Sequence, residues 1–176
     1  MKKKPFKVVI VILNYMNYQE TISCVNSALS QKGTEFKIVV VDNGSTNESY
    51  KIIMERYCNN RQVRVLRSKE NLGFAKGNNL GIKFAKEKLK ADFILLLNSD
   101  TIVTDEYYIS KMISNYDESV GVIGSEIILR NKKAQKPYCE YVEFPAILLY
   151  YLKIFNELYG WNIFENQIDK LLKKYK

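Results

Sequence analysis

The chain has 176 residues, 47% of them hydrophobic, which is enough to bury the core of one domain, with or without a tail. It carries 27 Lys and Arg against 19 Asp and Glu, a formal net charge of +8, which favours anionic partners such as phosphate esters. Histidine is absent, which excludes histidine-based acid–base catalysis, Ser-His triads and histidine metal sites. The three cysteines are far apart, so we expect no zinc site or disulfide framework, and a cytoplasmic location.

The first predicted element is a strand over residues 8–13, because this run is continuous, apolar and mostly β-branched, as in a strand buried on both faces of a parallel sheet. The run is too short for a signal-peptide core, and no stretch reaches the ~18 apolar residues of a membrane span. Residues 18–31 then carry apolar or small side chains at helical spacing, which predicts the first helix.

A second buried strand is predicted over residues 37–41. It ends in a polar turn in which Ser45 or Thr46 is expected to cap a helix running from about residue 48 to 58. A third strand is predicted over 62–66, a turn over 71–74 and a helix over 75–88.

The remaining predicted elements are a strand over 92–97, a helix over 105–116 and a strand over 120–123. Alternation of this kind predicts an α/β fold with an open, mostly parallel sheet, flanked by helices and joined by right-handed crossovers. We expect one domain over 1–130. The rest, 131–176, is expected to hold a basic loop at 131–136 and a tail of two amphipathic helical runs, 144–155 and 164–175.

Polar residues directly follow three of the predicted strands, at the edge where ligands bind in open parallel sheets. Ionised Asp42 can accept hydrogen bonds from a base or ribose. Asp100 could hold Mg²⁺, which takes one or two carboxylates and completes its shell with water and phosphate. Each Asp could instead serve only as a helix cap or turn former. The residues concerned are Asn14-Tyr15, Asp42-Asn43 and Asn98-Ser99-Asp100.

Three glycines, Gly73, Gly77 and Gly81, recur every four residues and match neither the dinucleotide fingerprint nor the P-loop. Lys76 and Asn78 fall in the first turns of the predicted helix, where backbone N–H groups and cations favour phosphate. A surface helix with structural glycines explains the same spacing.

Four strings, in this order and spacing, resemble successive motifs of the family 2 glycosyltransferases, especially the rhamnosyltransferase-like branch that builds bacterial surface polysaccharides. The resemblance covers roughly residues 7–129. The strings are Val11-Ile12-Leu13-Asn14-Tyr15, Val40-Val41-Asp42-Asn43-Gly44-Ser45-Thr46, Asn71-Leu72-Gly73-Phe74-Ala75-Lys76-Gly77-Asn78-Asn79-Leu80-Gly81-Ile82 and Leu96-Leu97-Asn98-Ser99-Asp100.

The resemblance implies a GT-A fold and inverting transfer from a UDP- or dTDP-sugar with Mg²⁺ or Mn²⁺. By position, Asn14 and Tyr15 would line the base pocket, and Asp42 would contact base or ribose. Asp100 would be the metal ligand, the last position of the family's D-x-D motif. Asn98 replaces the first Asp of that motif, which implies a hydrogen bond to sugar or ribose there. With Ser99, Asn43, Gly73, Phe74, Lys76 and Asn78, these residues make up the expected donor site.

The family's acceptor half and its carboxylate general base have no recognisable counterpart after residue 130. Glu140 and Glu143 are nearest in position, but their surroundings do not resemble that motif. The catalytic base therefore stays unassigned. Two alternatives follow: a transferase, alone or with a partner, or a truncated, non-catalytic donor-binding fragment. The acceptor would be a sugar or a lipid-linked sugar. The basic amphipathic tail could contact the inner face of the membrane. Nucleic-acid binding is not expected.

Overall fold

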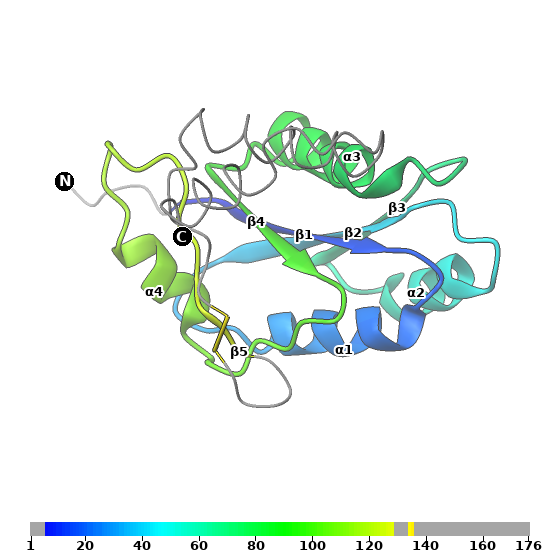
Figure 1. Cartoon of the computed structure of the whole chain (residues 1–176), viewed down its shortest axis with the longest axis horizontal. Coiled ribbons are helices and arrows are strands. Elements are labelled where there is room, and N and C mark those ends of the chain that lie inside the picture. Colours follow the sequence, from blue (N-terminus) through cyan, green and yellow to red (C-terminus); the bar gives the residue numbers. More distant parts are fainter. Residues whose placement is uncertain (1–5, 129–133, 136–176) are drawn as a thin grey trace, which may run out of the picture. The chain divides into compact units, whose positions relative to one another are not determined.

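The computed structural model describes residues 6–128 and 134–135, and the chain divides into two compact units, Met1–Gly121 and Val122–Lys176. The first unit is built on a sheet of four parallel strands in the order β3-β2-β1-β4 (Figure 1). The sheet confirms the predicted α/β fold. Its strands are β1 (Val8–Asn14), β2 (Phe36–Asp42), β3 (Val63–Arg67) and β4 (Phe93–Asn98).

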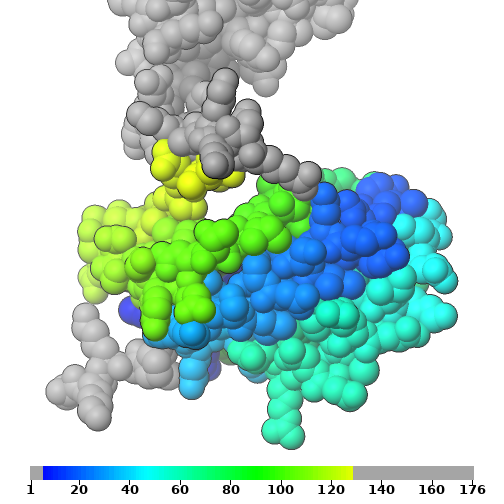
Figure 2. All heavy atoms as spheres, turned by 90° about the horizontal axis from the view of Figure 1, so that it is seen from below, coloured from blue at the N-terminus to red at the C-terminus, as the bar shows by residue number. Residues whose placement is uncertain are grey.

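Helices cover both faces of this sheet, with α1 and α2 on one face and α3 on the other (Figure 1). Figure 2 looks onto the first of these faces, where the blue atoms of α1 lie beside the cyan atoms of α2. A further helix, α4, packs Ile109 into the same core as α1. The helices are α1 (Tyr18–Leu29), α2 (Ser49–Tyr57), α3 (Gly73–Glu87) and α4 (Tyr108–Ser114).

The two central strands explain why their sequences are continuously apolar. Successive side chains of a strand point to opposite faces. Val9 and Val11 of β1 therefore join Val39 and Val41 of β2 under α3. The alternate residues, such as Ile10 of β1, pack against α1 and α2. Each central strand thus buries both of its faces, which fixes the middle of the sheet.

The predicted strand over 120–123 is wrong. Residues 117–120 form a turn instead, in which Val120 N donates to Asp117 O and Ser119 N donates to the Asp117 carboxylate. Val122 is 91% exposed, and Val120 and Ile123 are only partly buried, so this short apolar run lacks the buried face that holds a strand in a sheet. Its residues also fall where one compact unit gives way to the next.

The described part of the second unit is a short antiparallel pair, β5 (Ile127–Ile128) with β6 (Ala134–Gln135). Residues 134–135 are therefore strand where a loop was expected. The predicted division after residue 130 falls between these two strands and stays a prediction. The two predicted helical runs of the tail lie outside the described residues. Within residues 6–128 and 134–135, no helix is both long and apolar enough to cross a membrane.

Candidate functional site

The parallel register brings three of the predicted residues to one edge of the sheet. Asn14 at the end of β1 pairs in register with Asp42 at the end of β2, and Leu13 pairs with Asn98 at the end of β4. The strand ends predicted to carry the chemistry are therefore neighbours. This edge is the place where open parallel sheets bind ligands.

Asp42 sits at the centre of a buried hydrogen-bond cluster. Asn14 Nδ2 donates to Asp42 Oδ2 at 2.8 Å, and the backbone N–H of Ser45 donates to Asp42 Oδ1 at 3.1 Å. The hydroxyl of Thr21, on α1, lies 2.8 Å from Asn14 Oδ1, which orients the amide so that its NH₂ faces the carboxylate. Asn14, Thr21 and Asp42 have no exposed surface.

The sequence predicted that Ser45 or Thr46 would cap α2, but neither side chain does so. The Ser45 hydroxyl accepts from the backbone N–H of Met16 at 2.9 Å and from Asn14 Nδ2 at 3.3 Å. The helix begins after Glu48, which makes no side-chain cap. The hydroxyl of Ser45 instead joins the loop after β1 to the loop after β2, which shapes the candidate site.

Arg67, the last residue of β3, also belongs to the site and was missed in the sequence. Its Nε lies 3.7 Å from Asp42 Oδ1, Nη2 donates to Ser45 O at 3.1 Å, and the guanidinium carbon stands 4.7 Å from the centre of the Tyr50 ring. A signal was present, because a basic residue directly follows the apolar run of the third strand. The pairing of β2 with β3 sets Asp42 opposite Arg67, and this pairing is needed to recognise the basic residue as part of the site.

Asn43 holds the loop that leads into α3. Its Nδ2 donates to Asn71 Oδ1 at 2.9 Å, and its Oδ1 accepts from the backbone N–H of Leu72 at 3.1 Å. Asn43 is almost fully buried. Its side chain is thus engaged within the chain, and the predicted contact with a ligand stays a prediction.

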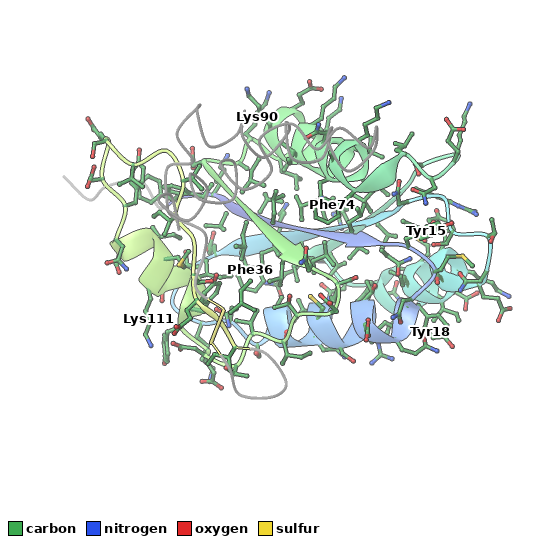
Figure 3. All side chains as sticks on the ribbon, in the orientation of Figure 1. Tyr15, Tyr18, Phe36, Phe74, Lys90 and Lys111 are labelled. Atoms are coloured by element: carbon green, nitrogen blue, oxygen red, sulfur yellow. The ribbon has the colours of Figure 1, made fainter. Side chains whose placement is uncertain are left out.

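The residues predicted at the start of α3 divide into exposed and internal ones. Gly73 begins the helix, two residues earlier than predicted, and Phe74 and Lys76 are exposed. Asn78 is buried, and its Nδ2 donates to Phe74 O at 3.0 Å. Tyr15 is exposed beside the end of β1 (Figure 3). The exposed aromatic rings are available to stack on a base, whereas Asn78 stabilises the first turn.

The Asn98-Ser99-Asp100 turn is held by a hydrogen bond from Cys24 on α1. Cys24 Sγ donates to Asn98 O at 3.3 Å, and Thr101 N donates to the same oxygen at 3.1 Å. Burial, and then the negative charge of Asp100, raise the pKa of Cys24 to about 12, against a hydrogen bond from Thr101 that lowers it. Cys24 is therefore a neutral thiol that donates a hydrogen bond, while Asn98 and Asp100 face solvent.

Asp100 suits a metal ion that binds together with a substrate diphosphate. Among residues 6–128, no group of three or more Cys, Asp or Glu side chains comes together. A magnesium ion needs only one or two carboxylates when a substrate phosphate and water complete its shell. The exposed Asp100, with Ser99 and Asn98 beside it, meets that requirement for a bound diphosphate, but not for a closed protein cage.

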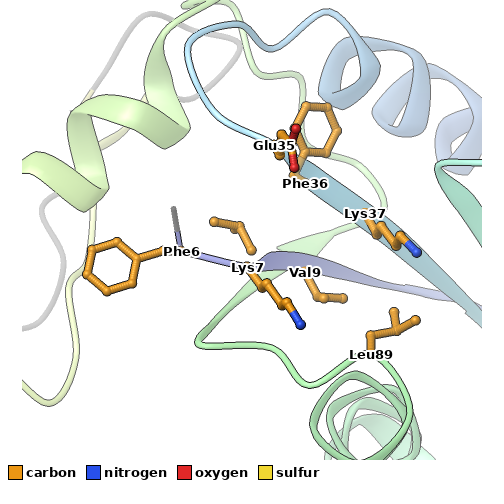
Figure 4. Close-up of a pocket in the computed structure, with 8 residues that line it drawn as sticks. Phe6, Lys7, Val9, Glu35, Phe36, Lys37 and Leu89 are labelled. Atoms are coloured by element: carbon orange, nitrogen blue, oxygen red, sulfur yellow. The ribbon is translucent and has the colours of Figure 1, made fainter. Parts of the chain in front are cut away.

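A pocket of about 430 Å³ lies at the opposite edge of the sheet, where β1 and β2 begin (Figure 4). None of the predicted site residues lines it. Its walls are mainly apolar, with two lysine side chains and one glutamate at the rim, so it does not compete with the carboxyl edge as the site of the chemistry. The lining residues are Phe6, Lys7, Val8, Val9, Glu35, Phe36, Lys37 and Leu89.

Three curated relatives of this chain are named as a hexosyltransferase, a glycosyltransferase and a chondroitin synthase. It is 31% identical over 97 residues to the low-salt glycan biosynthesis hexosyltransferase Agl10 of Haloferax volcanii, covering 55% of this chain and 29% of that protein. It is 30% identical over 124 residues to the glycosyltransferase GlyG of Streptococcus pneumoniae, covering 70% and 38%. It is 29% identical over 111 residues to the chondroitin synthase of Escherichia coli, covering 61% of this chain and 16% of that protein. The chain thus spans well under half the length of these relatives.

Solved structures share the fold. The mannosyltransferase PcManGT from Pyrobaculum calidifontis, in complex with GDP-Man and Mn²⁺, superposes with a TM-score of 0.60 at 15% identity over 68% of this chain and 35% of that one. TarS 1-349 of S. aureus in complex with UDP gives 0.51 at 24% identity, covering 61% and 31%. Residues 8–164 also match the profile of the family described as Glycosyl transferase family 2. This chain therefore belongs to glycosyl transferase family 2.

Proposed function

We propose that this chain binds a nucleoside diphosphate-sugar donor, a UDP- or dTDP-sugar, at the carboxyl edge of the β3-β2-β1-β4 sheet. It would do so for inverting sugar transfer in surface polysaccharide synthesis. The observation that carries the proposal is the register that sets Asn14, Asp42 and Asn98 side by side. The UDP in the TarS complex and the GDP-Man and Mn²⁺ in the PcManGT complex support a nucleotide-sugar and a divalent cation.

The strand order gives the donor a direction. Neighbouring strands lie about 4.8 Å apart, so the end of β3 is about 14 Å from the end of β4 across the sheet. Asp100 follows β4 and would hold Mg²⁺ or Mn²⁺ with the diphosphate. The nucleoside then extends toward β2 and β3, between the exposed rings of Tyr15 and Phe74. The cation would neutralise the charge that develops on the leaving diphosphate.

Residues at the start of α3 would assist at the phosphates. The ammonium of Lys76 is exposed, and the first N–H groups of a helix favour anions. Cys24 and Asn43 would act indirectly. Cys24 holds the turn that carries Asn98, and Asn43 holds the turn that leads into α3. The acceptor, whether sugar or lipid-linked, the cytoplasmic location and the membrane contact of the tail remain predictions.

The test of the donor site is a thermal shift with UDP or dTDP, with and without Mn²⁺. A ligand at 100 times its Kd stabilises the folded state by about 2.7 kcal/mol, which is readily measured. We expect Mn²⁺ to increase the shift in the wild-type chain. We expect Asp100→Asn to lose that increase.

Asp92→Asn is the matched control, since it makes the same change to an exposed carboxylate at the other end of β4. It should keep the Mn²⁺-dependent shift. A shift of equal size in Asp100→Asn and the wild type would refute the metal assignment, and no shift with either nucleotide would refute the donor site. Sugar transfer to a supplied acceptor separates a transferase from a donor-binding subunit that does not catalyse.

A further inference from the structure

Asp42 is the acidic residue nearest the middle of the site, yet none of its surface is exposed. Its two oxygens accept from Asn14 and from the Ser45 backbone N–H. A buried carboxylate needs such partners, because an unpaired charge away from water is costly. In this structure a ligand cannot touch the carboxylate unless a covering group moves.

Arg67 has the opposite properties. Its side chain is 48% exposed, although three contacts hold it in one place: the Asp42 carboxylate, the Ser45 carbonyl and the Tyr50 ring. Exposed arginines usually gain little from one surface ion pair. Three anchors on two elements and a loop fix the guanidinium far better than one surface pair would.

The fixed guanidinium still has donors to give. It carries five N–H groups. Nε faces Asp42 and one N–H of Nη2 serves Ser45 O, while Nη1 makes no hydrogen bond to residues 6–128 that would occupy it. A lysine could not do the same, since its point charge lacks the planar fork that bridges two acceptors and presents a third donor.

We propose that Arg67 is the residue at this edge that contacts the nucleoside, donating a hydrogen bond to a carbonyl oxygen of the base, and that Asp42 is a positioning residue which holds Arg67. The inference rests on the proposed donor site and adds a residue to it. The strand order decides which part of the donor Arg67 meets. It lies on β3, about 14 Å across the sheet from the end of β4, which carries Asp100, so it faces the base end and not the diphosphate.

The experiment compares Arg67→Gln and Arg67→Lys with the wild type by titration calorimetry with UDP and with UMP, in the presence of Mn²⁺. If the wild type prefers dTDP, dTDP and dTMP replace them. We expect Arg67→Gln to weaken both nucleotides by the same factor, about tenfold or more, because a hydrogen bond to a charged group is lost. We expect Arg67→Lys to recover only part of the loss.

Arg64→Gln is the matched control, because Arg64 lies on the same strand and donates to Val63 O at 3.0 Å, remote from Asp42. It should leave both affinities unchanged. Melting temperatures without ligand report any structural loss separately. Wild-type affinity in Arg67→Gln would overturn the inference. Full recovery of affinity in Arg67→Lys would also overturn it. So would weaker binding of UDP by Arg67→Gln with unchanged binding of UMP.

A double-mutant cycle tests the role of Asp42. If Asp42 acts through Arg67, Asp42→Asn weakens binding in the wild-type background and adds little in the Arg67→Gln background. Additive losses would show that Asp42 affects binding independently of Arg67 and would overturn its assignment as the residue that positions Arg67. Failure of the wild type to bind any of the nucleotides refutes the proposed function, whereas normal binding unaffected by Arg67→Gln refutes this inference alone.

Discussion

Gly44 lies where two loops of the candidate site approach most closely. Its φ is +70°, and a Cβ at this position would stand 2.3 Å from the backbone carbon of Glu70 and 2.7 Å from the nitrogen of Asn71. Backbone atoms cannot rotate away as the end of a side chain can. Gly44→Ala must therefore separate the loop after β2 from the loop that leads into α3.

Gly73→Ala supplies the reference for the size of this effect. Gly73 has a φ of +77°, but a Cβ there would meet nothing within 4 Å. It therefore loses only the conformational term, about 1–2 kcal/mol for a left-handed L-residue. Gly44→Ala carries the same term and about 1–3 kcal/mol of overpacking as well, a total of about 2–5 kcal/mol.

Urea unfolding followed by circular dichroism measures both variants against the wild type. We expect Gly44→Ala to have the lower free energy of unfolding, by about 1–3 kcal/mol relative to Gly73→Ala. Equal losses in the two variants, within about 0.5 kcal/mol, would refute the reasoning that the contact between the loops, rather than the backbone angle, makes a glycine necessary at position 44.

Two further predictions concern α3 and α1. Gly81→Ala should destabilise the chain in urea unfolding although helix propensity alone favours Ala by about 1 kcal/mol, because the new Cβ would lie 2.4 Å from Val11 Cγ1 and 3.0 Å from Val41 Cγ2; a more stable variant would contradict this packing. Cys24 has its pKa raised from 9.0 to about 12 in the folded chain, so its contribution to stability is present below pH 9 and is lost as the pH rises toward 12. Cys24→Ala should therefore lose less stability than the wild type between pH 9 and 12, and parallel curves would show that the thiol does not titrate as described.

The sequence predicted the central sheet well, because the relevant signal is local. Apolar β-branched runs bounded by turn residues mark β1 and β2 without knowledge of their neighbours. Residues 120–123 show the limit of the same rule. They are apolar too, but whether such a run becomes a strand depends on a partner that is not written in its own residues.

The roles within the site were less predictable. Ser45 has the residue type of a helix cap, and its hydroxyl instead bonds the loop after β1. The buried state of Asp42 and the contact with Arg67 depend on which strands pair, and those residues are 25 positions apart in the chain. No spacing rule connects them.

The sequence by itself determined the fold class and the edge at which the polar residues gather, since both follow from local hydrophobic pattern and from the direction of parallel strands. Only the tertiary structure decided which of those side chains face solvent. The register sets Asp42 opposite Arg67, but Asp42 ends an inner strand and is buried, whereas Arg67 ends the edge strand β3 and stays half exposed. Burial is thus decided by neighbours that are distant in the sequence.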